Sequence, residues 1–265
     1  MAQNKGYVIY EGASPVDPDT EITVIAIMQS GNSKTGNMVQ TYILVKDTDP
    51  REASKTGLDY AICGNCQHRG QAHNDPNKKL AKNRTCYVNI GQGVLIVWKQ
   101  YKKGAYPKIQ GHQAIAEIGR GRVVRLGTYG DPAMVQGYIW DSLLTHAAGR
   151  TGYTHQSDQP GAYVRPDITM VSADTYQAAQ AAWAQGFRTF RTVPIQESTS
   201  ATLAQIDKAN ETLCPASEEA GKRVQCENCK LCSGSMIKAK NIVIPLHDTK
   251  SNSIKRRQTL QIQGA

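Results

Sequence analysis

Four cysteines in the C-terminal third of the chain constrain its structure more than any other feature of the sequence. Cys226, Cys229 and Cys232 follow one another at C-x2-C-x2-C spacing, and Cys214 lies upstream of them. Thiolates at such spacing converge on one zinc ion or on one iron–sulfur cluster, each of which takes four ligands. The neighbouring residues are polar, which argues against simple packing in a core. The pattern predicts a metal site, with His247 competing for the fourth ligand position.

A second set of cysteines stands in the first half of the chain. Cys63 and Cys66 form a C-x2-C pair, and Cys86 follows after a polar stretch that contains His68 and His73. Cys86 and one of these histidines would complete a zinc site, or the three thiolates would hold a cluster with one iron left open. Zinc is the expected metal, with an iron–sulfur cluster as the alternative, because both use the same thiolates.

The use of cysteine also indicates a compartment. No stretch approaches the ~20 consecutive apolar residues of a membrane span, and the N-terminal residues lack the apolar run of a secretory signal. We therefore expect a cytoplasmic protein, in the host cytoplasm if it is viral, where clustered cysteines bind metal more often than they form disulfides.

The charge balance predicts an anionic partner. The chain of 265 residues carries 31 Lys and Arg against 22 Asp and Glu, a formal net charge of +9. Basic residues gather in three places, at 78–84, at 99–103 and at 250–257. Nucleic acid, and DNA in particular, is the partner that this uneven charge favours.

The order of predicted elements indicates an α/β protein. Two β-branched apolar runs, 22–28 and 39–45, make the N-terminal part strand-rich. From residue 122 strands alternate with helices: strands at 122–126, 152–155, 168–172, 187–193 and 242–246, and helices at 132–148 and 174–185. This pattern predicts parallel strands in a small or incomplete (β/α) barrel with cysteine-rich metal-binding insertions. We expect an N-terminal region at 1–110 and a barrel-like core at 111–265.

Acidic residues follow two of the predicted parallel strands, where reacting groups gather in such folds. Asp131 stands in a Gly-Asp-Pro turn and Asp174 follows the strand at 168–172. Both are candidate catalytic residues, and both also suit the first position of a helix as caps. Gly130, Tyr153 and His155 lie at strand ends and are candidate substrate-binding residues. A pair of carboxylates on neighbouring strands suits chemistry at a glycosidic bond.

The region of roughly 120–250 resembles the tRNA-guanine transglycosylases and their phage relatives that act on DNA. The resemblance rests on the Gly130-Asp131-Pro132 turn, the cysteine trio at 226–232 and His247. It implies zinc bound by Cys226, Cys229, Cys232 and His247, with Asp131 and Asp174 exchanging guanine in DNA for a 7-deazaguanine base. Phage DNA modified in this way resists host restriction. The trio of that family has C-x-C-x2-C spacing, which differs from the spacing here.

Two other interpretations stay open. The chain also resembles radical-SAM proteins, which use a partial (β/α) barrel, three cysteines on an early loop, a glycine-rich acidic strand end and a C-terminal auxiliary cluster. Cys63, Cys66 and Cys86, then Gly130-Asp131, then the cysteines at 214–232 follow that order without the usual C-x3-C-x2-C motif. The third interpretation is a zinc-stapled nucleic-acid-binding protein without catalysis.

Overall fold

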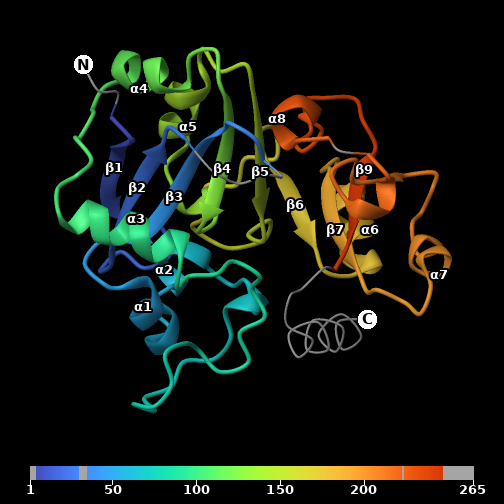
Figure 1. Ribbon diagram of the computed structural model, residues 1–265, viewed down its shortest axis with the longest axis horizontal. Coiled ribbons are helices and arrows are strands. Elements are labelled where there is room, and N and C mark those ends of the chain that lie inside the picture. Colours follow the sequence, from blue (N-terminus) through green and yellow to red (C-terminus); the bar gives the residue numbers. More distant parts are fainter. Residues whose placement is uncertain (1–3, 30–34, 223, 247–265) are drawn as a thin grey trace.

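The structure, a computed structural model, describes residues 4–29, 35–222 and 224–246, and these build one continuous sheet of nine strands. The sheet order is β1-β2-β3-β4-β5-β6-β7-β9-β8 (Figure 1). The strands are β1 (Gly6–Ala13), β2 (Glu21–Ile27), β3 (Val39–Val45), β4 (Val123–Tyr129), β5 (Gly149–Thr154), β6 (Met170–Ala173), β7 (Thr189–Val193), β8 (Glu211–Leu213) and β9 (Asn241–Pro245).

Strand direction divides the sheet into two parts. β1, β2 and β3 are antiparallel neighbours, whereas every pairing from β3 to β8 is parallel. From β3 onward, consecutive strands are sheet neighbours joined by a segment that leaves the sheet, as parallel pairing requires; the exception is β7 and β8, between which β9 lies. β1 and β8 each pair on one side within the described residues, so the sheet stays open. The expected α/β class is confirmed, and the part of the chain that the structure describes forms no closed barrel. The expected boundary at residue 110 falls between β3 and β4, which are paired strands.

The helices lie in the connections between strands. They are α1 (Pro50–Thr56), α2 (Tyr60–Cys63), α3 (Gly93–Lys102), α4 (His112–Gly119), α5 (Gly137–Leu144), α6 (Tyr176–Ala184), α7 (Thr199–Leu203) and α8 (Cys226–Cys229). Within the described residues no helix is both long and apolar enough to cross a membrane. The connection after β3, which carries α1 and α2, and the turn that carries α8 lie at opposite ends of the strands (Figure 1).

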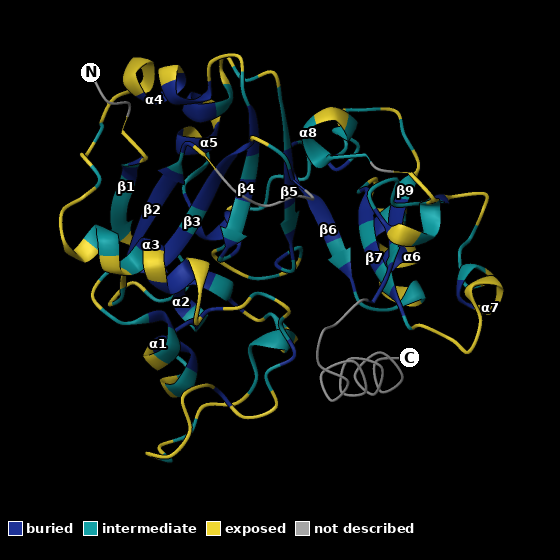
Figure 2. Cartoon of the chain, in the orientation of Figure 1, coloured by how far each residue is buried: buried dark blue, intermediate teal, exposed yellow. Residues whose placement is uncertain are grey.

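The main core packs around β2, β3 and β4. Alternating strand residues such as Ile22, Val24 and Leu126 are fully buried, and Trp140 of α5 closes the core from the helix layer. Figure 2 shows these strands as the most buried part of the molecule and the polar 70–80 stretch as exposed. A smaller apolar cluster joins Met170 of β6, Ile242 of β9 and Cys232, with Tyr153 of β5 and Phe190 of β7 packed against it. The sheet is therefore a rigid support, and its connections carry the polar and sulfur-containing residues.

One predicted helix is shorter than expected. The sequence suggested a helix over 132–148 with proline as its first residue. Residues Pro132–Met134 form a single 3-10 turn capped by Asp131, α5 begins only at Gly137, and β5 begins at Gly149. Val135 and Gln136 are extended, which breaks the helix into two pieces. As a result β5 starts three residues earlier than predicted and ends immediately before His155.

The cap of α6 also differs from the sequence prediction. Asp174 was a candidate N-cap for this helix. Thr175 holds that position instead, and its Oγ1 accepts a hydrogen bond from the main-chain N–H of Ala178 at 3.1 Å. Because a helix needs one capping side chain at this place, the carboxylate of Asp174 is left to bond elsewhere.

Candidate metal centre at the strand ends

Three neighbouring parallel strands end at one edge of the sheet and deliver polar residues there. β4 is followed by Asp131, β5 by His155 and β6 by Asp174, and these strands pair in the order β4-β5-β6. Parallel strands place their carboxyl ends at the same edge, which is where ligands bind in open α/β sheets. The connection after β3 reaches the same edge and adds Cys66 and His68.

The side chain of Asp174 lies between two histidines. Its Oδ1 is 2.9 Å from Nε2 of His68, and its Oδ2 is 3.6 Å from Nε2 of His155. The two imidazole rings meet edge to face with centroids 5.6 Å apart. Within the described residues, these three side chains form the group of His, Cys, Asp or Glu ligand atoms that all lie within 4.8 Å of one another.

Neighbouring polar groups orient this group from outside. Nδ1 of His68 is 2.7 Å from the hydroxyl of Thr85, which directs Nε2 towards Asp174. Gln67 donates a hydrogen bond to Oδ2 of Asp174 at 2.6 Å. Side-chain exposure is 14% for His68, 27% for His155 and 15% for Asp174, so the group is mostly buried but still accessible to solvent. Two imidazoles and a carboxylate held in this way can ligate a divalent metal or exchange protons.

Asp131 lies outside this group and is more deeply buried. The carboxylate is buried, with Oδ1 accepting from the main-chain N–H of Ala133 at 3.0 Å and Oδ2 from that of His155 at 2.8 Å. Burial raises the pKa of Asp131, although these two hydrogen bonds favour its charged form. Its two oxygens thus fix the turn after β4 and the main chain of His155.

The first cysteine set gathers next to the histidines. The side chain of Cys66 hydrogen-bonds to His155. Burial raises the pKa of the Cys63 thiol well above its usual value, and Asp59, Cys66 and Cys86 raise it further. All seven cysteines are free of disulfides. The structure therefore brings the set Cys63, Cys66 and Cys86 to the same edge of the sheet as Asp174.

Gln156 fixes the loop that holds the first two cysteines. Its amide donates to the carbonyl of Cys63 at 2.8 Å and accepts from the N–H of Asn65 at 3.0 Å. The side-chain oxygen of Gln156 lies so close to Gly64 that a Cβ there would be 2.1 Å away. Only glycine permits this approach, and its φ of +50° also suits glycine.

The second cysteine set surrounds a small cavity. Cys214, Cys226, Cys229 and Cys232 all line it, together with Tyr153, Lys230 and Ile242. Burial raises the pKa of the Cys232 thiol to about 12; a hydrogen bond with Tyr153 opposes this rise and the other three cysteines add to it. The stem of Lys230 packs against Gly149, the first residue of β5. This site thus lies towards the amino ends of the strands.

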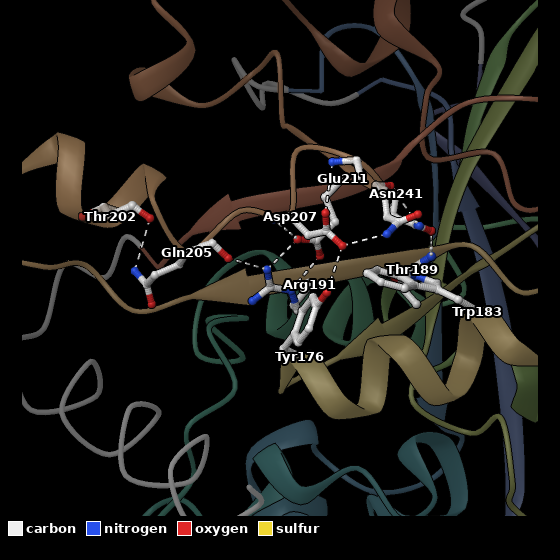
Figure 3. A network of polar contacts seen from close by, with 11 residues as sticks. Tyr176, Trp183, Thr189, Arg191, Thr202, Gln205, Asp207, Glu211 and Asn241 are labelled. Atoms are coloured by element: carbon white, nitrogen blue, oxygen red, sulfur yellow. Dashed lines mark hydrogen bonds and ion pairs between the residues drawn. The ribbon is translucent and has the colours of Figure 1, made fainter.

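A buried ion pair holds the strand that leads to Cys214. Arg191 of β7 donates to both carboxylate oxygens of Glu211 in β8, at 2.7 and 2.6 Å, and to the carbonyl of Gln205 at 2.9 Å. Asp207 accepts from the hydroxyl of Tyr176 at 2.8 Å. Figure 3 shows this network joining β7 to the segment before β8. The position of Cys214, three residues after Glu211, therefore depends on its attachment to Arg191 of β7.

The other predicted residues have mixed placements. The φ of Gly130 is +78°, and a Cβ there would lie 2.6 Å from Cβ of Ile43, so this glycine allows β4 to end against β3. The ring of Tyr153 belongs to the cavity of the second cysteine set, away from His155. His73 bonds to the carbonyl of Leu80 outside the centre. His247 lies outside the described residues.

Comparison with known proteins gave no match to a family model, to a curated protein or to a solved structure.

Proposed function

We propose that this chain is an iron–sulfur enzyme of the radical-SAM type. The observation that carries the proposal is the order of features along one open sheet of parallel strands. Cys63, Cys66 and Cys86 follow the first parallel strand β3, Gly130-Asp131 follows β4, and the second cysteine set precedes the last strand β9. This is the order of an early cluster loop, a glycine-rich acidic strand end and a C-terminal auxiliary cluster.

The long interval between Cys66 and Cys86 does not keep these residues apart. Gln71 and Lys82 exchange main-chain hydrogen bonds of 2.8 and 2.9 Å, which closes the excursion between them. The N–H of Cys86 then donates to the carbonyl of His68 at 3.0 Å. The three thiols therefore suit one cluster, with three thiolates leaving one iron open.

Sulfur spacing supports a cluster over zinc. Tetrahedral zinc with Zn–S bonds of about 2.3 Å requires sulfurs about 3.8 Å apart. Among the described residues, His68, His155 and Asp174 form the group of three potential ligand atoms that lie within 4.8 Å of one another. Neither cysteine set therefore has three sulfurs within that distance of one another. The second set instead borders a cavity. A cubane cluster holds its four thiolates farther apart than zinc does, which is compatible with this spacing.

Together with S-adenosylmethionine, a cluster with an open iron supplies radical chemistry. The chain's own groups beside it are His155 and Asp174. The hydrogen bond between His155 and Cys66 orients this imidazole towards the first cysteine set, and Asp174 holds it from the other side. His68, Asp174 and His155 can accept or deliver a proton at this edge of the sheet.

Base exchange on DNA guanine stays a prediction with less support. That chemistry needs two carboxylates that reach the sugar and the departing base. Asp174 is partly exposed, whereas both oxygens of the buried Asp131 accept main-chain hydrogen bonds. Labelled guanine or 7-deazaguanine would test it: incorporation into DNA that is lost in Asp131→Ala and in Asp174→Ala supports exchange.

Metal analysis of protein purified without oxygen tests the main proposal. We expect a brown protein with iron and acid-labile sulfide, at roughly four irons per site. Cys63→Ser should lose about the iron and sulfide of one cluster. Cys229→Ser should lose about the iron and sulfide of the other. Met236→Leu, an exposed change that follows the second set, is the control and should keep both. Colourless protein that carries stoichiometric zinc would overturn the proposal.

A further inference from the structure

Arg125 occupies the middle of β4, between the two cysteine sets. It pairs in register with Gln40 of β3 and Thr151 of β5. Thr151 and Tyr153 line the cavity of the second cysteine set, and the Arg125 guanidinium carbon lies 5.9 Å from the centre of the Tyr153 ring. Nη2 of Arg125 donates to the hydroxyl of Tyr87, the residue after Cys86, at 3.3 Å. The guanidinium thus contacts one neighbour of each cysteine set.

This guanidinium is partnered differently from the other arginines that the structure describes. Each of the others donates to a carboxylate or to a main-chain carbonyl; they are Arg51, Arg69, Arg84, Arg120, Arg122, Arg150, Arg165, Arg188 and Arg191. Arg125 donates to a tyrosine hydroxyl and makes no ion pair with a carboxylate of the described residues. Its Nε is buried without an acceptor there, as is that of Arg150, whose guanidinium donates instead to the carbonyl of Asp167.

This arrangement leaves part of the hydrogen-bonding capacity of the Arg125 guanidinium unused. A guanidinium carries five N–H donors and stays charged, and a buried donor without an acceptor, such as Nε of Arg125, costs free energy. The Tyr153 ring face and the Tyr87 hydroxyl give weak compensation. The planar fork of donors matches a carboxylate or a phosphate, which accept two parallel hydrogen bonds from it.

We propose that Arg125 binds an oxyanion of the substrate, a phosphate or a carboxylate, between the two cysteine sets. The inference rests on the proposed function, because it treats this side of β4 as the substrate pocket of that enzyme. The formal net charge of +9 agrees with an anionic substrate. Tyr87, with 66% of its surface exposed, lies where such a substrate would enter.

Equilibrium binding by calorimetry at fixed ionic strength tests the site. The probes are inorganic phosphate, guanosine 5′-monophosphate and succinate, with guanosine as an uncharged match. We expect at least one anion to bind the iron-containing wild type, and Arg125→Gln to weaken it about tenfold or more, as loss of a charge-assisted pair requires. Arg125→Lys should recover part of the affinity. Which probe responds separates phosphate from carboxylate.

Controls separate this inference from its alternatives. Arg120→Gln removes an exposed arginine paired with Glu117 and should bind the probes as wild type does. Iron content and far-ultraviolet circular dichroism of Arg125→Gln report whether it keeps its clusters and its fold. If the wild type binds no anion more tightly than Arg125→Gln, the inference is wrong. Zinc-containing protein that still binds anions through Arg125 would overturn the proposed function and leave the anion site standing.

Discussion

The main-chain N–H of His155 donates a hydrogen bond to Oδ2 of Asp131 at 2.8 Å. Through this bond the turn after β4 determines where the chain leaves β5. His155 then reaches Asp174, which follows β6, so one buried carboxylate aligns three consecutive strand ends. Asp131 is in this sense a positioning residue for the histidine.

Asp131→Asn tests that role. An asparagine offers one acceptor oxygen in place of two, so one of the N–H groups of Ala133 and His155 loses its partner. We expect a loss of about 1–3 kcal/mol in the free energy of unfolding, measured by urea denaturation. Asp158→Asn changes an exposed carboxylate and should have little effect. Wild-type stability in Asp131→Asn would contradict the positioning role.

Asp49→Ala should destabilise the connection that leads from β3 to the first cysteine set. Asp49 caps α1, accepting from the N–H of Arg51 at 2.8 Å, and the side chain of Arg51 lowers the pKa of Asp49. We expect a cost of about 1 kcal/mol at neutral pH. Because the folded-state pKa is lowered, this contribution is present above the unfolded value of about 3.9 and is lost as the pH falls through the folded value.

Unfolding of both proteins at pH 7 and at pH 3 measures this difference. The difference in the free energy of unfolding between wild type and Asp49→Ala should be smaller at pH 3 than at pH 7. Asp19→Ala, an exposed aspartate in the β1–β2 connection, serves as the control. An equal difference in the free energy of unfolding at both pH values would show that the charge of the Asp49 carboxylate does not contribute to the cap.

Arg191→Met should both destabilise the fold and disturb the second cysteine set. It leaves the fully buried Glu211 without its partner, which costs about 3–5 kcal/mol. β8 would loosen, and with it Cys214. We expect lower stability by denaturation and lower metal retention. Arg165→Met breaks exposed ion pairs and should cost at most about 1 kcal/mol. If Arg191→Met is destabilised but keeps its full metal content, the ion pair does not support the second cysteine set.

Gly130→Ala and Gly186→Ala form a matched pair. Both glycines have nearly the same backbone, with φ of +78° and +79°, but a Cβ at 186 meets nothing within 4 Å. Gly186→Ala should cost about 1–2 kcal/mol from the left-handed backbone alone. Gly130→Ala adds a contact of 2.6 Å with Ile43 and should cost more. Equal melting temperatures for the two variants would mean that β3 shifts at Ile43 to accommodate the added methyl group without further cost.

The sequence by itself determined the α/β class, most parallel strands and the division of the cysteines into two sets. Those features depend on short-range pattern: β-branched runs, turn residues and thiol spacing, which local chemistry dictates. It also identified His155 and Asp174 as strand-end residues, because parallel strands gather their carboxyl ends at one edge.

Tertiary structure decided which of these residues meet. No spacing in the sequence connects His68 with Asp174, or Arg125 with Tyr87; the folding of the connection after β3 against the sheet brings them together. The same contacts give Asp131 and Asp174 different surroundings, one buried under main-chain donors and the other between two histidines. A carboxylate's role follows from its burial and its partners, and both are properties of the folded chain.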